Sequence, residues 1–154
     1  MSPPITYEEA TASDFERLVG LRIAAMRESL ERLGRFDEAR SRARFGESFE
    51  PTRTRHIVVE GKRVGFVALK PEGDGLRVDH LYVHPSAQKC GVGGAVLAAV
   101  VADADARGVP LFVTALRGSD SKRFYLRYGF VLTGETEWDV HYRRDARGHQ
   151  PGTV

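Results

Sequence analysis

The segment DHLYVHPSAQKCGVGGAV, residues 79–96, decides how this chain folds. Residues that favour strands precede Pro85, as in a strand that ends at a turn. A glycine turn at 91–94 follows, and residues 92–107 are apolar enough for a largely buried helix. Backbone N–H groups at the start of such a helix converge on an anion, and the helix dipole adds positive potential. The segment therefore predicts a strand, a glycine turn able to bind phosphate, and a helix.

The glycine turn departs from two common phosphate-binding motifs. A P-loop ends in Gly-Lys-Ser/Thr, whereas Gly93-Gly94-Ala95 stands here. The dinucleotide-binding fingerprint needs a third glycine at the position that Val96 occupies. A tight turn with close helix–sheet packing would use the same glycines, so the turn alone leaves both interpretations open.

Apolar periodicity, capping residues and turn residues predict the remaining elements. In the first half of the chain these are a strand at 5–11, a helix from Ser13 to about Leu33, an arginine-rich helix at 37–49, and strands at 56–59, 64–69 and 76–84. Ser13 is the expected N-cap of the first helix, and Glu16 completes a capping box with it. In the second half they are a strand at 111–116, a helix at 119–128, and strands at 130–133 and 138–143. The turns at 60–63 and 71–75 are short, which indicates an antiparallel meander in the middle of the chain. We therefore expect a mixed α/β (α+β) fold with a twisted, mostly antiparallel sheet of about seven strands and about four helices.

Composition narrows the class of protein. The chain has 154 residues, which fits one domain over 1–154 with a core at about 5–143 and a polar tail at 144–154. Its 23 Lys+Arg against 21 Asp+Glu give a net charge of +2, too even to indicate a nucleic-acid or anionic-membrane binder. The longest apolar run, 92–102, is short of the ~18–20 residues of a membrane span, and the N-terminus lacks the features of a signal peptide. Cys90 is the single cysteine, which excludes an internal disulfide or a cysteine-based zinc site and is compatible with the cytoplasm that we expect.

Two motifs together resemble the GNAT acyltransferase superfamily. Residues 79–85, followed by Gln88-x-x-Gly91-x-Gly93, are similar to its acetyl-CoA-binding motif. Residues 124–130, Phe-Tyr-Leu-Arg-Tyr-Gly-Phe, are similar to its second signature. The resemblance covers about residues 5–143 and implies the GNAT fold, acetyl-CoA as cosubstrate and no metal. It also implies N-acetyl transfer to a primary amine by direct attack in a ternary complex.

The resemblance assigns the donor site residue by residue. Backbone groups of strand 81–83 would serve the pantetheine arm, and main-chain donors of the glycine turn would hold the pyrophosphate. The implied acetyl-CoA-binding residues are Leu81, Tyr82, Val83, Gln88, Lys89, Cys90, Gly91, Val92, Gly93, Gly94, Ser119, Ser121, Phe124 and Tyr128. Ser119 and Ser121 stand in for an asparagine that the family commonly carries, because that position is Gly118 and the chain contains no asparagine.

Three of these assignments need a closer look. Lys89 can instead be an exposed, solubilising lysine. Cys90 is rejected as a nucleophile because the pyrophosphate turn is far from a thioester, and we expect it to be a small packing residue. Tyr128 can serve packing or an adenine-side contact.

Two residues are candidates for catalysis. Tyr125 matches the family's general acid, which protonates the departing thiolate; the alternative is a core aromatic with a satisfied hydroxyl. Asp79 is our choice of base, since by alternation it shares a strand face with apolar side chains. The alternative for Asp79 is a salt bridge to Arg77 or Arg117. The other candidate bases are His80, then Glu137, Asp139 and His141.

The acceptor is a small-molecule or peptide amine that no motif identifies. Side chains expected to shape its pocket are Arg22, Met26, Arg27, Arg35, Trp138 and Tyr142. The arginine-rich stretch 35–55 is either a solvated helix face or a surface that steers an acidic substrate. A second functional hypothesis is a GNAT-fold protein that senses acyl-CoA without turnover; the retained Tyr125 and Asp79 argue against it. The oligomeric state stays open between a monomer and a homodimer.

Overall fold

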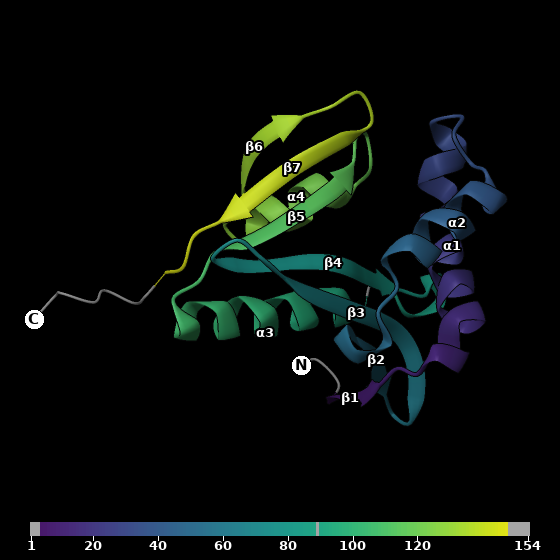
Figure 1. Cartoon of the computed structure of the whole chain (residues 1–154), viewed down its shortest axis with the longest axis horizontal. Helices are drawn as coiled ribbons and strands as arrows, with labels where there is room; N and C mark the ends of the chain where they lie inside the picture. Colours follow the sequence, from purple (N-terminus) through teal and green to yellow (C-terminus); the bar gives the residue numbers. More distant parts are fainter. Residues whose placement is uncertain (1–3, 89, 148–154) are drawn as a thin grey trace, which may run out of the picture. The chain divides into compact units, whose positions relative to one another are not determined.

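The computed structural model describes residues 4–88 and 90–147, which form two compact units. The first takes in Met1–Ala68 and His80–Gly93, the second Leu69–Asp79 and Gly94–Val154. The described strands form a seven-stranded, mostly antiparallel sheet in the order β1-β2-β3-β4-β5-β7-β6 (Figure 1). Strands β3 (Lys62–Glu72) and β4 (Gly75–Val83) contribute to both units. The predicted fold class is confirmed, and none of the described helices is long and apolar enough to cross a membrane.

The first unit packs two helices against the strands at one end of the sheet. Its elements are β1 (Ile5–Glu9), α1 (Phe15–Arg32), α2 (Glu38–Ser48), β2 (Thr54–Val59), the beginning of β3 and the end of β4. Helices α1 and α2 lie side by side (Figure 1), and Asp37 caps α2 by accepting a hydrogen bond from the N–H of Arg40. Leu18, Val19, Phe45 and Phe66 are buried between the helices and the strands.

The second unit contains the remaining helices and strands. These are α3 (Val92–Arg107, whose first two residues fall in the first unit), β5 (Leu111–Leu116), α4 (Ser121–Arg127), β6 (Val131–Glu135) and β7 (Asp139–Arg144). Strand β7 lies between β5 and β6 and is antiparallel to both (Figure 1). The bounds predicted for α3 are confirmed, but the prediction that it is largely buried is wrong. Val96 and Leu97 are buried while Ala98 and Ala99 are exposed, because alanine is small enough to face solvent at little cost.

Strands β4 and β5 pair in parallel only at their beginnings. The pairs are Leu76 with Leu111 and Arg77 with Phe112. A contact just before them fixes this start, since Leu76 N donates to Pro110 O at 3.0 Å and a Cβ at Gly75 would collide with that carbonyl. Among the described residues this ladder stops at Arg77, although β4 runs on to Val83.

The entry into α1 differs from the prediction. Asp14, not Ser13, is the N-cap of α1, and a short 3₁₀ turn at Ala12–Asp14 precedes it. Thr11 forms the capping box with Asp14: the N–H of Thr11 donates to Asp14 Oδ2 at 2.8 Å. The predicted box of Ser13 and Glu16 is therefore wrong, because an equivalent pair two residues earlier forms it.

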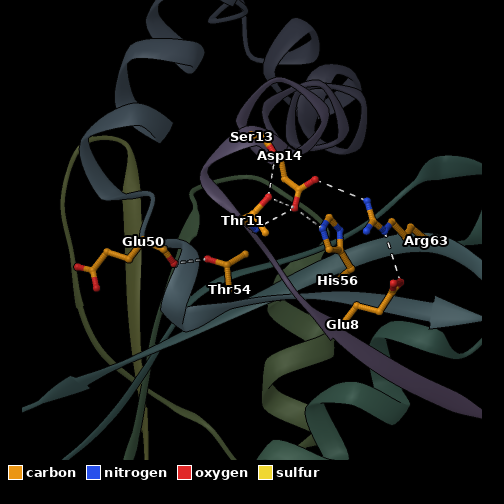
Figure 2. Close-up of polar contacts among 8 residues, drawn as sticks. All are labelled: Glu8, Thr11, Ser13, Asp14, Glu50, Thr54, His56 and Arg63. Carbon is orange, nitrogen blue, oxygen red and sulfur yellow. Dashed lines mark hydrogen bonds and ion pairs between the residues drawn. The ribbon is translucent and has the colours of Figure 1, made fainter.

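Asp14 also joins α1 to the sheet (Figure 2). The buried His56 on β2 bonds Asp14 Oδ2 through Nε2 at 3.0 Å, and Arg63 on β3 lies 3.6 Å from Asp14 Oδ1. The hydrogen bond with His56, and after it the one from the N–H of Thr11, lowers the pKa of Asp14 from 3.8 to about 2. Asp14 is thus a closed structural node of the first unit.

Two further sequence expectations need correction. The hairpin between β2 and β3 turns on Glu60 and Gly61 alone, both with positive φ (52° and 77°), so the strands extend further than predicted. The polar tail does not begin at 144, because Arg144 belongs to β7 and is 5% exposed. Its guanidinium forms a two-pronged ion pair with Asp105, which also accepts from the N–H of Arg147 at 2.8 Å.

Candidate functional site

The glycine turn is built by local hydrogen bonds at the end of β4. The N–H of His84 donates to Val64 O on β3 at 2.8 Å, and a 3₁₀ turn over Pro85–Ala87 follows. Gln88 Nε2 then donates to Val83 O at 2.9 Å, so its side chain ties the turn back to the strand. Gly91 has φ 79°, a conformation that favours glycine, immediately before α3.

Two predicted residues of the turn, Cys90 and Lys89, have different outcomes. Cys90 is exposed, so the expectation that it is a packing residue is wrong: its side chain has no core to fill at this point of the turn. Lys89 lies outside the described residues.

At the end of β4, the backbone groups of alternate residues face opposite edges of the strand. A Cβ at Gly65 would collide with Tyr82 O, which places that carbonyl on the side of β3. Because backbone groups alternate in direction along a strand, those of Leu81 and Val83 face away from β3. Val83 O is used by Gln88, while the amide groups of Leu81 lie on an edge where a ligand amide can add as a strand would. This edge and the glycine turn fit an extended amide chain that ends in phosphates.

In the second unit, Tyr125 is firmly packed on α4. It is 9% exposed, and its ring centroid lies 5.3 Å from Phe124, 5.6 Å from Phe130 and 5.8 Å from Tyr142. The core role that we gave as its alternative is therefore present, and a chemical role for the hydroxyl stays a prediction. Tyr142, expected in the acceptor pocket, is buried in this same aromatic cluster.

The residues around α4 are also held by short polar contacts. Ser119 Oγ and Ser121 Oγ lie 2.6 Å apart at the start of the helix. Tyr128 Oη donates to Gly94 O at 3.1 Å, which fixes α4 to the first turn of α3 within this unit. A Cβ at Gly94 would lie 2.8 Å from that hydroxyl oxygen, so this contact requires glycine.

Asp79 has a different partner from the two that the sequence suggested. Its Oδ1 lies 3.6 Å from Lys70 Nζ on β3. Arg77 instead forms a bidentate ion pair with Glu72, and Arg117 pairs with Glu135. Lys70 was missed because nothing in the sequence gives the register of β3 against β4.

The alternative bases differ in their surroundings. His80 is buried, and its Nε2 lies 3.0 Å from Ser48 Oγ at the end of α2. His141 Nδ1 lies 2.9 Å from Thr114 Oγ1 on β5. Asp139 donates its backbone N–H to Thr136 Oγ1, and Glu137 is exposed.

The early helices bring Arg22 of α1 to the end of β4. Arg22 NH1 donates to Ser41 O on α2 at 3.4 Å, and its Cζ lies 5.8 Å from the ring centroid of Tyr82. Ser41 and Ser48 are site residues that sequence reasoning missed, because serines in a polar helix give no signal of a tertiary contact. Of the other expected acceptor residues, Arg27 is exposed and pairs with Glu31, and Trp138 is 43% exposed.

Comparison with known proteins adds a family and a fold. The model of the acetyltransferase (GNAT) domain matches residues 52–132. No curated protein matches the chain in sequence.

Solved structures match the fold at low identity. The PaiA N-acetyltransferase from Thermoplasma acidophilum, in complex with coenzyme A, has a TM-score of 0.74 at 14% identity, covering 92% of this chain and 99% of that one. The ribosomal-protein-S18-alanine N-acetyltransferase from Escherichia coli has a TM-score of 0.70 at 16% identity, covering 98% and 99%. N-acetylglutamate synthase from Neisseria gonorrhoeae, complexed with coenzyme A and N-acetyl-glutamate, has a TM-score of 0.65 at 20% identity, covering 96% of this chain and 36% of that one.

Proposed function

The chain belongs to the acetyltransferase (GNAT) family, and on that premise we propose that it transfers an acetyl group from acetyl-CoA to a primary amine by direct attack in a ternary complex. The match confirms the resemblance carried by the two sequence motifs. The observation that carries the proposal is the end of β4, where the described ladder to β5 has stopped at Arg77 and the backbone of Leu81 faces away from β3, followed directly by the glycine turn. Coenzyme A in the solved structure of the PaiA enzyme supports the same donor.

The donor would be held mainly by backbone groups. Leu81 and its neighbours Tyr82 and Val83 would pair with the pantetheine amides, and the N–H groups of the glycine turn would bind the pyrophosphate. The remaining residues proposed to contact acetyl-CoA are Gln88, Lys89, Cys90, Gly91, Val92, Gly93, Gly94, Ser119, Ser121, Phe124 and Tyr128. In this set Gln88 and Tyr128 act by holding the turn and the start of α3, as their hydrogen bonds to Val83 O and Gly94 O indicate.

Acetyl-CoA supplies an activated thioester, and the protein must deprotonate the amine and protonate the thiolate. We assign the second task to Tyr125, because a phenol of ordinary pKa about 10 can donate to a thiolate of similar basicity. Its aromatic contacts would hold the hydroxyl in a fixed direction. We assign the first task to Asp79, acting on the amine through water, with Lys70 Nζ at 3.6 Å fixing the carboxylate.

The test is release of free thiol from acetyl-CoA across a panel of primary amines, with calorimetry of CoA binding alongside. We expect thiol release that depends on at least one amine, and loss of CoA binding in Gly91→Glu, which places a carboxylate in the glycine turn. Binding of CoA without turnover of any amine would favour the acyl-CoA sensor instead. Unchanged CoA affinity in Gly91→Glu would contradict the assignment of the turn.

Variants in the same assay test the two catalytic roles. Tyr125→Phe should lower kcat by about 10²–10⁴-fold, as for a lost general acid, and leave CoA affinity nearly intact. Tyr7→Phe is the control: Tyr7 lies on β1 and is 40% exposed, so removing its hydroxyl should change kcat little. Asp79→Asn should lower kcat/KM for the amine and leave CoA affinity nearly intact, and an unaltered kcat/KM would make Asp79 structural.

A further inference from the structure

Arg22 occupies a position where an apolar side chain is expected. On α1, Leu18 and Val19 are fully buried and face the sheet. Residues three and four positions apart share a helix face, so Arg22 lies on the same face as these two, one turn further along. Arginine seldom faces a core unless its charge has a partner.

The structure gives the Arg22 guanidinium less than a full set of partners. Its hydrogen bond to Ser41 O is long at 3.4 Å, and among the described residues its buried Nε has no hydrogen-bond partner. Over residues 4–88 and 90–147, no carboxylate oxygen lies within 4.0 Å of the Arg22 guanidinium, the limit for an ion pair. Two arginines of the same unit, Arg42 and Arg63, do have acidic partners, in Glu16 and Glu8. Arg22 differs from both in this respect.

The surroundings of Arg22 favour an anion. The cation lies over the ring of Tyr82, next to His80 and Phe66, whose rings are 5.9 Å and 5.5 Å from that ring. In such a half-buried aromatic setting an unpaired charge is unfavourable, and a bound counter-charge gains in strength. A guanidinium presents two parallel N–H donors, which match the two oxygens of a carboxylate. One guanidinium also balances one negative charge, as a carboxylate carries.

The contact with Tyr82 places Arg22 beside strand 81–83, to which the proposed function assigns the acetyl donor. We propose that the acceptor is an amine that also carries a carboxylate, such as an amino acid, and that Arg22 binds this carboxylate. A rotation of the Arg22 side chain that gives up the long bond to Ser41 O would free its guanidinium N–H groups for the ligand's two oxygens. This inference rests on the proposed function.

The carboxylate takes no part in the chemistry. The amine nitrogen forms a bond to the acetyl carbon as the thioester C–S bond breaks; the amine loses one proton and the thiolate gains one. Arg22 is thus a specificity-determining residue, and its effect should fall on acceptor binding.

The experiment compares amino acids with their own α-amides, which keep the amine and lose the charge. In the wild type we expect kcat/KM to favour the carboxylate form by at least about tenfold. Arg22→Gln should lower kcat/KM for the carboxylate form by about 10–100-fold, the value of one charged hydrogen-bonded contact, and leave the amide form nearly unchanged. Arg22→Lys should retain part of the preference, and the KM for acetyl-CoA should stay constant. Arg17→Gln, an exposed arginine of the same helix, is the matched control.

Calorimetry separates this inference from the proposed function. Binding of an amino acid or its N-acetyl product that disappears in Arg22→Gln but not in Arg17→Gln supports the carboxylate site even if no amine is turned over. Equal use of acids and amides by the wild type, a preference that survives in Arg22→Gln, or a stronger preference for an aminoalkyl phosphate would each overturn it. Circular dichroism of each variant confirms that the comparison is made between folded proteins.

Discussion

Arg22 in the first unit is half-buried and Arg144 in the second unit is buried, and the surroundings of these two arginines are opposite. In the second unit, Arg144 donates to both oxygens of Asp105, at 2.7 Å and 3.1 Å, and through Nε to Tyr128 O at 2.7 Å. In the first unit, Arg22 makes a long hydrogen bond to Ser41 O, and its buried Nε has no partner among the described residues. The chain therefore completes the contacts of one arginine and leaves those of the other incomplete.

The contrast is not a property of the units themselves. Asp14, in the same unit as Arg22, is fully engaged by Thr11, His56 and Arg63 (Figure 2). Buried polar groups of folded proteins are nearly always hydrogen-bonded. We call a site closed when its charged group has all its hydrogen-bond partners within the protein, and open when it does not. A closed site stabilises the fold, whereas an open site needs another explanation. We explain Asp14 and Arg144 by stability and Arg22 by a ligand.

Removal of Arg144, a buried charge with a complete set of hydrogen-bond partners, should have the largest effect on stability. Arg144→Met leaves the carbonyl of Tyr128 without its guanidinium donor and Asp105 with the N–H of Arg147 alone, and we expect the free energy of unfolding to fall by about 3 kcal/mol. Urea denaturation monitored by circular dichroism measures this. Arg143→Met is the matched control, because Arg143 is the neighbouring residue and pairs with the exposed Asp145. A decrease in Arg144→Met no larger than in this control would remove the distinction between closed and open sites.

Acid should weaken the closed site at Asp14. Its folded pKa, about 2, lies below its ordinary value of 3.8, so its contribution to stability is complete above about pH 4 and is lost as the pH falls through 2. Asp14→Asn lacks this contribution at every pH. The wild type should therefore exceed the variant by about 1–2 kcal/mol near neutral pH, and the difference should shrink toward pH 2. Unfolding titrations of both proteins at several pH values test this, and a gap that is independent of pH would show that the charge of Asp14 is unimportant.

Local patterns in the sequence were sufficient for most of the fold. The bounds of α3 and β5 follow from an apolar run closed by Gly108 and Pro110, and the two motifs indicated the family. The long-range contacts did not follow from pattern. The pairing of Asp79 with Lys70 depends on strand register, and the closure of Arg144 on Asp105 depends on how a helix meets a distant strand.

For the candidate site, the residue types could be predicted but not their surroundings. Arg22 was expected near the acceptor together with Met26, Arg27 and Arg35, and nothing in the sequence singled it out. Its distinction is an incomplete set of partners, which depends on every neighbouring side chain at once. The same holds for Cys90, whose exposure reverses what its residue type suggests.

The smallest effect on stability should come from replacing Arg22, the charge of the open site. Arg22→Met keeps a long unbranched side chain with good helix propensity and replaces a half-buried charge by an apolar group among aromatic rings. The hydrogen bond that this change removes is 3.4 Å long, and replacing a poorly paired charge in such a place is often neutral or stabilising. We expect the free energy of unfolding to change by less than about 1 kcal/mol, in either direction, in the same urea titration used for Arg144→Met.

The sign of that change carries information about Arg22. A gain in stability would match the general observation that residues kept for a ligand cost stability when the ligand is absent. A decrease as large as that of Arg144→Met would instead make Arg22 a structural residue, because its guanidinium would then be stabilising the first unit as Arg144 stabilises the second. The carboxylate site would in that case need support from binding measurements alone.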